Sequence, residues 1–378
     1  MSKFILVPDS FKGSLSSMEI CAIMSRELLS IYPHADIVSI PVADGGEGTV
    51  DAFLAACGGQ KISLLSKGPF MEDISSFYGL IEKGNTAVIE MAACAGLPLV
   101  GTDLHPDRTT TYGVGLLIKD ALQRGCQRVI VGLGGSATND LGVGCAAALG
   151  VSFLDQAAKS FIPTGGTLGQ VAQIDPGGLL PEVRQAEIIT MCDIDNPLYG
   201  PNGAAYVFSP QKGADPGMVE FLDGQLQAGA ERIKCDLGLD VSDLPGGGAA
   251  GGMGAGMVAF LGAKLQMGIE VLLDRVDFDQ QMVGTDLVLT GEGKIDSQSL
   301  RGKVVIGVAR RAKRAGVPVV AVVGTIGDGS DKAYSEGVSA IYSINRVPLP
   351  FAEAKKMAQP NMAATMHDLA VLFHELGV

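Results

Sequence analysis

The stretch KFILVPDSFKGSLSSMEICAIM, residues 3–24, indicates the fold class. It begins with a short apolar run, Phe4 to Pro8, which predicts a buried strand. A loop, DSFKGSL, follows, after which Ser16 and Glu19 stand at the spacing of a helix capping box. Apolar residues then recur on one face of a helix, at Ile20, Ile23, Met24 and Leu28. A strand, a Gly-containing loop and an amphipathic helix in this order are typical of an α/β sheet.

The same alternation of strand and helix returns at both ends of the chain. Near the start, the sequence predicts a strand at Asp36–Pro41 and a helix from about Thr49 to Ala56. Near the end, it predicts a strand at 286–290, a helix at 304–315, strands at 317–324 and 339–344, and a helical stretch at 351–376 that Pro360 interrupts. Both ends therefore have the texture of a parallel sheet.

The centre of the chain has a different texture. Residues 61–100 predict antiparallel strands (KISLL, SSFYGLI and TAVIEMA) joined by Gly-containing turns. A helix (YGVGLLIKDALQ), a strand (RVIVGLG) and a long Gly-rich region around 244–256 follow. We therefore expect two domains, one built from residues 1–67 and 286–378 and the other from the inserted residues 68–285.

The composition argues against a nucleic-acid-binding protein and against a membrane protein. The 378 residues include 28 Lys+Arg and 41 Asp+Glu, a net charge of −13, which argues against a nucleic-acid binder because such proteins need a basic surface. No apolar run reaches the roughly 18 residues of a membrane span, and the start lacks a signal-peptide layout. The seven cysteines are scattered singly, which favours reduced thiols. We expect a cytoplasmic protein that contacts neither nucleic acid nor membrane.

Three loops combine glycine with acidic or amide side chains directly after a predicted strand: ADGGEGT (43–49), GLGGSATND (132–140) and TGEGKIDSQ (290–298). Ligands of open α/β sheets bind at the carboxyl ends of the strands. Glycine there lets backbone N–H groups approach an anion, and a following helix N-terminus adds positive charge. The loops therefore favour binding of a phosphate and a metal ion, although glycine also makes ordinary tight turns.

The known nucleotide motifs leave one alternative open. The P-loop motif G-x-x-x-x-G-K-[ST] does not occur. Residues 132–137, however, fit G-x-G-x-x-A after a strand, and Asp155 ends a strand-like VSFLD at about the distance of the acidic residue in dinucleotide-binding folds. A dinucleotide-dependent oxidoreductase acting on a small hydroxy acid is therefore an alternative. Against it, Asn139 and Asp140 place polar groups where such a helix would pack closely on the sheet.

Asp193 and Asp195 follow the apolar run EIIT. Alternate residues of an extended chain point the same way, so both carboxylates could face one Mg²⁺ ion or one substrate hydroxyl; an Asx-turn explains them equally well. Lys12 and Lys303 each adjoin a glycine in a loop after a strand. An ammonium group there suits a phosphate or a carboxylate, but these positions alone favour a solvated lysine.

Five segments taken together resemble, in order, the motif series of the bacterial glycerate kinase family of the first type. They are PDSFKGSLSS (8–17), PVADGGEGTVDA (41–52), GLGGSATND (132–140), CDIDNPLYGPNGAAYVFSPQKGA (192–214) and TGEGKIDSQSLRGKVVIGVA (290–309). The resemblance runs from about residue 3 to the end of the chain. Leu141 departs from it, since a second small residue is expected after Asn-Asp, and this bears on packing more than on chemistry.

The resemblance implies a fold and a reaction. The fold has a Rossmann-like or flavodoxin-like domain formed by both chain ends and a second α/β domain inserted between them, with the active site in the cleft between the two. The reaction is transfer of the γ-phosphoryl group of ATP to D-glycerate with Mg²⁺, at the 2-hydroxyl, giving 2-phosphoglycerate and ADP. Glycerate and ATP are thus the expected partners, and a homo-oligomer is compatible with the sequence. A non-catalytic sugar-acid sensor that uses the same cleft is a further alternative.

The resemblance also suggests roles for residues in the matching motifs. The carboxylates Asp193 and Asp296 are candidates for binding Mg²⁺, and Asp193 for orienting the attacking hydroxyl as general base. Lys12 and Lys303 would neutralise the γ-phosphoryl group or the glycerate carboxylate. Glycerate would contact the loop residues Asp44, Gly45, Gly46 and Glu47. Nucleotide phosphates would contact Gly134, Gly135, Ser136, Asn139, Gly291, Glu292 and Gly293.

Overall fold

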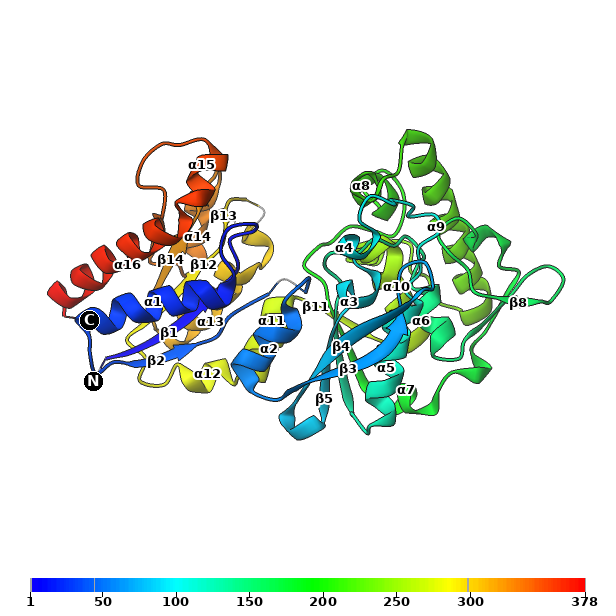
Figure 1. Cartoon of the computed structure of the whole chain (residues 1–378), viewed down its shortest axis with the longest axis horizontal. Helices are drawn as coiled ribbons and strands as arrows, with labels where there is room; N and C mark the ends of the chain where they lie inside the picture. Colours follow the sequence, from blue (N-terminus) through cyan, green and yellow to red (C-terminus); the bar gives the residue numbers. More distant parts are fainter. Residues whose placement is uncertain (1, 44, 298, 378) are drawn as a thin grey trace. The chain divides into compact units, whose positions relative to one another are not determined.

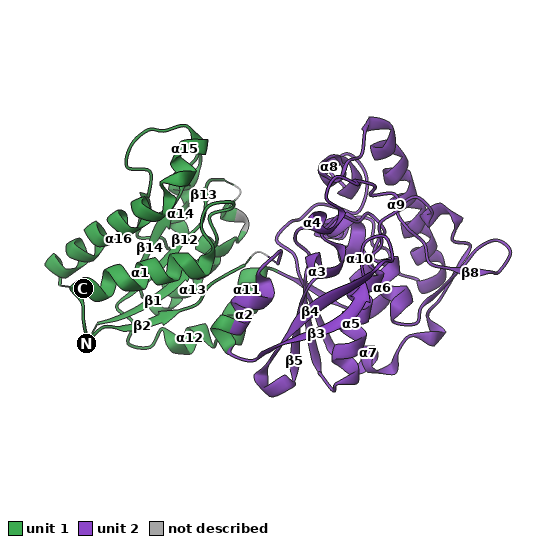
Figure 2. Cartoon of the chain, viewed as in Figure 1, with its two compact units in different colours: residues 1–44, 55–57, 267–378 green, residues 45–54, 58–266 purple. Residues whose placement is uncertain are grey.

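The computed structural model of the chain describes residues 2–43, 45–297 and 299–377. It divides into two compact units, which Figure 2 shows in different colours. Unit 1 consists of residues 1–44, 55–57 and 267–378, and unit 2 of residues 45–54 and 58–266. Both ends of the chain lie in unit 1 (Figure 1). The α/β fold class predicted from the sequence is confirmed.

Unit 1 is built on a five-stranded parallel sheet. Its spatial order is β16-β14-β12-β1-β2. The strands are β1 (Lys3–Pro8), β2 (Asp36–Ser39), β12 (Leu287–Gly291), β14 (Val319–Val323) and β16 (Ala340–Ser343). Counted along the chain, the order is 2-1-3-4-5, the flavodoxin type of doubly wound sheet. Its direction of winding changes between β1 and β12, where such folds bind ligands.

Two helices from opposite ends of the chain cover the unit 1 sheet together. α1 (Ser17–Ile31) and α16 (Ala358–Glu375) lie side by side (Figure 1) and share one apolar cluster with Phe4 and Leu6 of β1. The remaining helices are α11 (Gly268–Arg275), α12 (Phe278–Gln281), α13 (Val304–Ala315), α14 (Ala333–Glu336) and α15 (Phe351–Lys356). A short pair, β13 (Lys294–Ile295) and β15 (Thr325–Ile326), adds to them.

Two local predictions for unit 1 have different outcomes. The capping box is confirmed: the Ser16 Oγ accepts from the Glu19 N–H at 3.2 Å, and the Glu19 carboxylate accepts from the Ser16 N–H at 2.8 Å. The predicted interruption at Pro360 is wrong. The two C-terminal helices are separated at Met357, and Pro360 lies in the first turn of α16. Proline is tolerated there because the first N–H groups of a helix have no partner within it.

Unit 2 contains a mixed six-stranded sheet of spatial order β11-β10-β6-β5-β4-β3. The strands are β3 (Gln60–Lys67), β4 (Asp73–Ile81), β5 (Thr86–Glu90), β6 (Arg128–Gly132), β10 (Glu187–Met191) and β11 (Lys264–Gln266). The antiparallel prediction is confirmed for β3–β4 and β4–β5. β5, β6, β10 and β11 continue the sheet in parallel.

Helices of unequal length complete unit 2. They are α2 (Thr49–Cys57, whose last three residues belong to unit 1), α3 (Ala92–Ala95), α4 (Leu97–Val100), α5 (Tyr112–Gln123), α6 (Val143–Ala148), α7 (Pro181–Gln185), α8 (Ala204–Phe208), α9 (Pro216–Leu237) and α10 (Ala249–Leu261). None of the helices in the described part of the chain is long and apolar enough to cross a membrane.

The strand that motivated the dinucleotide alternative does not join the parallel sheet. VSFLD forms β7 (Ser152–Leu154), which pairs antiparallel with β8 (Ser160–Phe161) and β9 (Gln173–Asp175) in a separate small sheet. The Asp155 carboxylate instead accepts the N–H groups of Ala157 at 2.8 Å and Lys159 at 3.0 Å in a turn. Asp155 therefore has a turn-forming role, and the oxidoreductase alternative loses one of the two sequence features on which it rested.

The unit boundaries differ from the predicted domain boundaries at 67/68 and 285/286. They lie at 44/45 and 266/267. Residues 60–67 belong to unit 2 because β3 pairs with β4 along its whole length. Residues 267–285 belong to unit 1 because they contain α11 and α12, which pack against α13.

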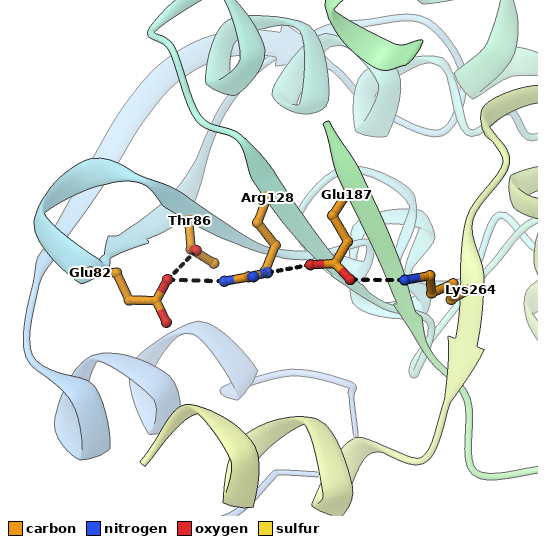
Figure 3. Close-up of polar contacts among 5 residues, drawn as sticks. All are labelled: Glu82, Thr86, Arg128, Glu187 and Lys264. Carbon is orange, nitrogen blue, oxygen red and sulfur yellow. Dashed lines mark hydrogen bonds and ion pairs between the residues drawn. The ribbon is translucent and has the colours of Figure 1, made fainter. Parts of the chain in front are cut away.

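The amino ends of the central strands in unit 2 are joined by a chain of charged groups (Figure 3). Arg128 donates to the carboxylates of Glu187 at 2.7 Å and Glu82 at 3.2 Å. Thr86 donates to Glu82 at 2.6 Å, and Lys264 donates to Glu187 at 3.0 Å. We call these five residues the amino-edge network. Its charged side chains pair with one another at the beginnings of four neighbouring strands, β5, β6, β10 and β11.

Candidate functional site

The carboxyl ends of three strands of the unit 2 sheet lie level with one another. Glu90 at the end of β5 and Met191 at the end of β10 are both in register with Gly132 at the end of β6. The loops that follow β6 and β10 contain predicted site residues. We call this end of the sheet, with residues 45–48, 133–142 and 192–203, the carboxyl edge. It is the end at which α/β sheets bind ligands.

Two of the predicted glycine loops touch at the carboxyl edge. The Gly134 N–H donates to the Gly45 carbonyl at 2.9 Å. A Cβ atom at Gly134 would lie 2.5 Å from the Gly46 Cα, so this approach requires glycine. Glu47 is exposed beside these loops. The structure therefore brings residues predicted for glycerate, Gly45 to Glu47, next to residues predicted for phosphate, whereas Asp44 lies outside the described residues.

A buried carboxylate positions the loop of residues 45–48. Glu90 is buried and accepts the Val50 N–H at 3.1 Å, at the beginning of α2. Burial raises the pKa of this carboxyl, and the hydrogen bond from the Val50 N–H opposes that rise. Because α2 follows the loop directly, Glu90 attaches the loop to the end of β5.

Sequence reasoning missed a buried cation at the carboxyl edge. Lys212 is 2% exposed, and its Nζ donates to the Ser136 Oγ at 2.8 Å and to the Thr138 carbonyl at 2.6 Å. Burial lowers the pKa of Lys212 to about 7, and the charge of Asp140 acts in the opposite direction. Lys212 lies in the segment SPQKGA of a recognised motif. Its position there was the available signal, but a lysine in a loop is ordinarily solvated.

Asp140 and Asn139 are neighbours with different roles. Asp140 is fully buried and accepts from the Thr111 N–H at 2.8 Å, the Thr111 hydroxyl at 2.9 Å and the Gly142 N–H at 3.1 Å. Burial raises the pKa of this carboxyl, and these hydrogen bonds lower it. Asp140 therefore attaches its loop to the start of α5, which is a structural role.

Asn139 and Thr138, by contrast, have buried polar groups that find no partner in the described part of the chain. Among the residues that the structure describes, the two polar atoms of the Asn139 amide have no hydrogen-bond partner. The same is true of the Thr138 hydroxyl. The hydroxyl of Thr190, in β10, is in the same condition. A buried polar group without a partner costs roughly 1–3 kcal/mol, so such a cluster requires an explanation. Their place at the ligand-binding end of the sheet favours completion by a ligand or a water molecule.

Asp193 is the second residue of the loop that follows β10, which ends at Met191. Asp193 is half-buried and Asp195 is exposed. The first residue of the loop extends the strand pairing, since the Cys192 N–H donates to the Gln266 carbonyl at 2.9 Å. The structure therefore places Asp193 at the same edge of the sheet as Ser136 and Lys212.

The Gly-rich region 244–256 supports both loops of this edge. The Gly248 N–H donates to the Asn196 carbonyl at 3.0 Å, and the Gly251 carbonyl accepts the Leu141 N–H at 3.1 Å. Leu141, the residue that departs from the family pattern, has a left-handed backbone (φ 57°) and is 1% exposed. Its side chain packs in the core of unit 2, so the departure concerns packing, as expected.

Unit 1 carries the second group of predicted residues, between β1 and β12 where the winding changes direction. Pro8 is in register with Gly291, and the Asp9 N–H donates to the Gly291 carbonyl at 2.8 Å. Lys12, in the loop after β1, is exposed, and its backbone N lies 3.6 Å from where a Gly293 Cβ would stand. Gly291 itself has a packing explanation, since a Cβ there would lie 2.1 Å from the Val322 carbonyl oxygen.

Glu292 is the buried titratable group of this second site. Burial raises the pKa of its carboxyl to about 7, and the hydrogen bond with Ser299, followed by the charge of Lys303, opposes that rise. In the described part of the chain, its Oε1 atom has no hydrogen-bond partner. Asp296 follows in the same loop, where its carboxylate lies 2.9 Å from the Lys294 Nζ. Lys303 is half-buried and precedes the first residue of α13.

The predicted residues therefore form two groups, one in each unit. The residues predicted for nucleotide phosphates are divided between them, with Gly134 to Asn139 in unit 2 and Gly291 to Gly293 in unit 1. Within residues 2–43, 45–297 and 299–377, no three His, Cys, Asp or Glu side chains cluster as a ready metal site. Asp193 and Asp296, each taken by itself, still fit Mg²⁺, because proteins bind this ion through as few as one or two carboxylates together with the phosphates of a substrate.

Comparison with known proteins identifies the family of the chain. Residues 4–374 match the family model of the Glycerate kinase family. The chain is 43% identical to a glycerate kinase of Bacillus cereus, with 98% of each chain covered. It is 42% identical to the glycerate 2-kinase of Escherichia coli, with 97% of each covered. The crystal structure of a glycerate kinase 2 from Salmonella typhimurium LT2 superposes with a TM-score of 0.87 at 41% identity, covering 99% of this chain and 98% of that one.

A match over nearly the whole chain, at this identity and with the same fold, is decisive for the family. The resemblance noted in the five motifs is thereby confirmed. The relatives are named as kinases, which argues against the alternative of a non-catalytic sensor. We conclude that this chain belongs to the glycerate kinase family and is an enzyme, a phosphotransferase.

Proposed function

We propose that the protein transfers the γ-phosphoryl group of ATP to the 2-hydroxyl of D-glycerate, giving 2-phosphoglycerate and ADP, with Mg²⁺. The family match supports glycerate as the acceptor, and a relative named glycerate 2-kinase supports the position. The observation that carries the proposal is the buried set at the carboxyl edge of unit 2. Lys212 and Ser136 supply a cation and a hydroxyl, and Asn139 supplies an amide that has no partner among the described residues; these groups suit an acid that also carries hydroxyl groups.

Phosphoryl transfer asks the protein mainly to position the reactants and to neutralise charge. Asp193 would accept the proton of the attacking hydroxyl or bind Mg²⁺, and Asp296 is the other candidate carboxylate for binding the ion. The metal, when bound, neutralises phosphate charge. Lys12 and Lys303 would do the same for the γ-phosphoryl group or the substrate carboxylate. Backbone N–H groups of the glycine loops would donate to anionic oxygens.

The test is incubation of the purified protein with Mg-ATP and D-glycerate, followed by ³¹P NMR of the products. We expect 2-phosphoglycerate and ADP. Formation of 3-phosphoglycerate would overturn the proposed position, and absence of any phosphoglycerate would overturn the proposed acceptor. Omitting Mg²⁺, or adding a chelator, should abolish turnover.

Glycerol is the matched control acceptor, because it keeps the hydroxyl groups and lacks the carboxylate. We expect little turnover of glycerol, since a charge-assisted anchor to a buried cation is lost. Equal turnover of glycerol and D-glycerate would show that no group of the site recognises the carboxylate.

A further inference from the structure

The contacts of Lys212 determine the direction of one hydroxyl group. A lysine ammonium can only donate hydrogen bonds. Its Nζ lies 2.8 Å from the Ser136 Oγ and 2.6 Å from the Thr138 carbonyl oxygen. Both oxygens therefore accept from Lys212. The Thr138 carbonyl has no proton of its own, but the Ser136 hydroxyl has one, and it cannot point toward the ammonium.

The proton of the Ser136 hydroxyl has no acceptor among the side chains and backbone groups that the structure describes. Ser136 is 7% exposed and follows Gly135, which is exposed. The hydroxyl therefore lies just below the surface of the loop, with its oxygen held from beneath by Lys212. A hydroxyl in this position is a donor that is oriented before a ligand arrives, and preorganised donors of this kind bind developing or fixed negative charge strongly.

The burial of Lys212 supports the same conclusion. An ammonium loses hydration when it is buried, and a methionine of similar volume would fill the same space without that cost. The charged group that acts on Lys212 is the carboxylate of Asp140, which is itself held by Thr111 and Gly142. Among the residues that the structure describes, Lys212 has no direct ion pair, so part of its charge is available to an anion bound at the loop.

We propose that Lys212 is a positioning residue that orients the Ser136 hydroxyl toward an anionic oxygen of a substrate. The inference rests on the proposed function, since it assigns a task to two residues of the same site. The ligand chemistry is an oxygen with negative charge, which either the carboxylate of the hydroxy acid or a terminal phosphate of the nucleotide provides. Ser136 makes the contact, and Lys212 acts through it.

A double-mutant cycle tests this coupling. The variants are Ser136→Ala, Lys212→Met and the double variant, each assayed with D-glycerate and ATP varied separately. We expect each single change to raise one KM by about 10- to 100-fold, the range of a hydrogen bond to a charged group, with a smaller effect on kcat. A rise in the KM for D-glycerate would identify the carboxylate as the ligand, and a rise in the KM for ATP would identify a phosphate. The double variant should be no worse than the worse single variant.

Several results would overturn the proposal. Multiplicative effects in the double variant would show that the two residues act independently. Unchanged KM values in Ser136→Ala would show that its hydroxyl contacts no substrate. Lys234→Met is the matched control, because Lys234 is in the same unit, pairs with Asp240 on the surface and should leave both KM values unchanged. A wild-type protein that does not turn over D-glycerate would instead refute the proposed function.

A second measurement applies if Lys212→Met does not fold. Lys212 loses its proton as pH rises through about 7, and a neutral amine accepts the Ser136 proton. The affected KM of the wild type should therefore rise between pH 6 and pH 9, and this rise should be absent from Ser136→Ala. The same pH dependence in both proteins would overturn the proposal.

Discussion

The two edges of the unit 2 sheet are formed by the same strands, yet their polar groups differ in kind. At the amino edge, Arg128, Glu187 and Lys264 satisfy one another with ion pairs on a partly exposed surface (Figure 3). At the carboxyl edge, Asn139 and Lys212 are almost completely buried. Here the amide of Asn139 has no partner in the described part of the chain, and the lysine has no direct ion pair.

The difference separates stability from function. Exposed ion pairs contribute roughly 0–1 kcal/mol each and need no ligand to be complete. Buried polar groups without partners destabilise the fold by about 1–3 kcal/mol each. A fold tolerates that cost where a ligand later supplies the missing partners. We therefore expect substitutions at the carboxyl edge to change catalysis and those at the amino edge to change stability alone.

The largest expected effect is that of Asp193→Asn at the carboxyl edge. The amide keeps the size and the turn-forming capacity of the side chain but loses the negative charge. If Asp193 acts as general base or binds Mg²⁺, kcat should fall by roughly 10²–10⁴-fold, while the free energy of unfolding changes by about 1 kcal/mol or less. Steady-state kinetics and thermal unfolding of the variant beside the wild type provide the measurement.

Glu187→Gln is the control for Asp193→Asn, because it makes the same chemical change at the amino edge. Its kcat should stay within about twofold of wild type, as expected for a site distant from the reactants. A near-normal kcat in Asp193→Asn would leave the Asx-turn as its role and move the expected catalytic carboxylate to Asp296. A large loss of kcat in Glu187→Gln would refute the contrast between the edges.

The next largest effect is expected for Gly134→Ala, which tests the contact between the two glycine loops. The added Cβ would lie 2.5 Å from the Gly46 Cα, so one loop must move. We expect a loss of about 2–3 kcal/mol in the free energy of unfolding together with lower activity. Gly224→Ala is the control, because nothing lies within 4 Å of that Cβ in α9. It should be neutral or stabilising, since alanine favours a helix.

Glu292→Gln tests whether a buried polar group at the carboxyl ends of the unit 1 strands also lowers the stability of the fold. The pKa of Glu292 is raised from 4.5 to about 7 by burial, so the folded state holds this proton more tightly than the unfolded state. Its stabilising contribution is therefore complete below pH 4.5 and is lost as pH rises through about 7. Relative to the variant, the wild type should lose on the order of 2 kcal/mol between pH 4.5 and 8.

Glu187, at the amino edge, is compared with Glu292 because the pKa of its carboxyl is shifted in the opposite direction. The hydrogen bond from Arg128, followed by that from Lys264, lowers the pKa of the Glu187 carboxyl. Its contribution is present above the ordinary glutamate pKa and is lost as pH falls. Denaturant unfolding of Glu187→Gln and Glu292→Gln across pH 4–8 should therefore give slopes of opposite sign relative to wild type. Slopes of the same sign would contradict the assignment.

The smallest effect is expected for Arg128→Met in the amino-edge network. The change removes the ion pairs to Glu187 and Glu82 and keeps most of the apolar stem. Because the group is partly solvated, we expect a loss of about 1 kcal/mol or less in the free energy of unfolding, diminishing with added salt. The kcat should equal that of the wild type. A kcat reduced more than tenfold would show that the amino edge also serves catalysis.

Several elements could be predicted from local sequence because local forces determine them. The helix at 304–315 and the helix YGVGLLIKDALQ occur with the predicted bounds, since their apolar periodicity is a property of consecutive residues. Pro360 and Asp155 were misjudged for the opposite reason. A proline interrupts a helix only if it lies beyond the first turn, and an acidic residue after a strand marks a dinucleotide site only if that strand joins the parallel sheet.

The sequence by itself determined the α/β class, the family and the loops that carry polar residues after strands, because motif order and periodicity are written along the chain. Only the tertiary structure decided which loops touch, as Gly134 and Gly45 do, and which polar groups are buried. Lys212 shows the reason most clearly. Its residue type predicts a solvated charge, and its actual environment depends on Ser136 and Thr138, more than 70 positions away along the chain. Desolvation is a property of the surroundings in space, so it becomes visible only when distant segments are packed together.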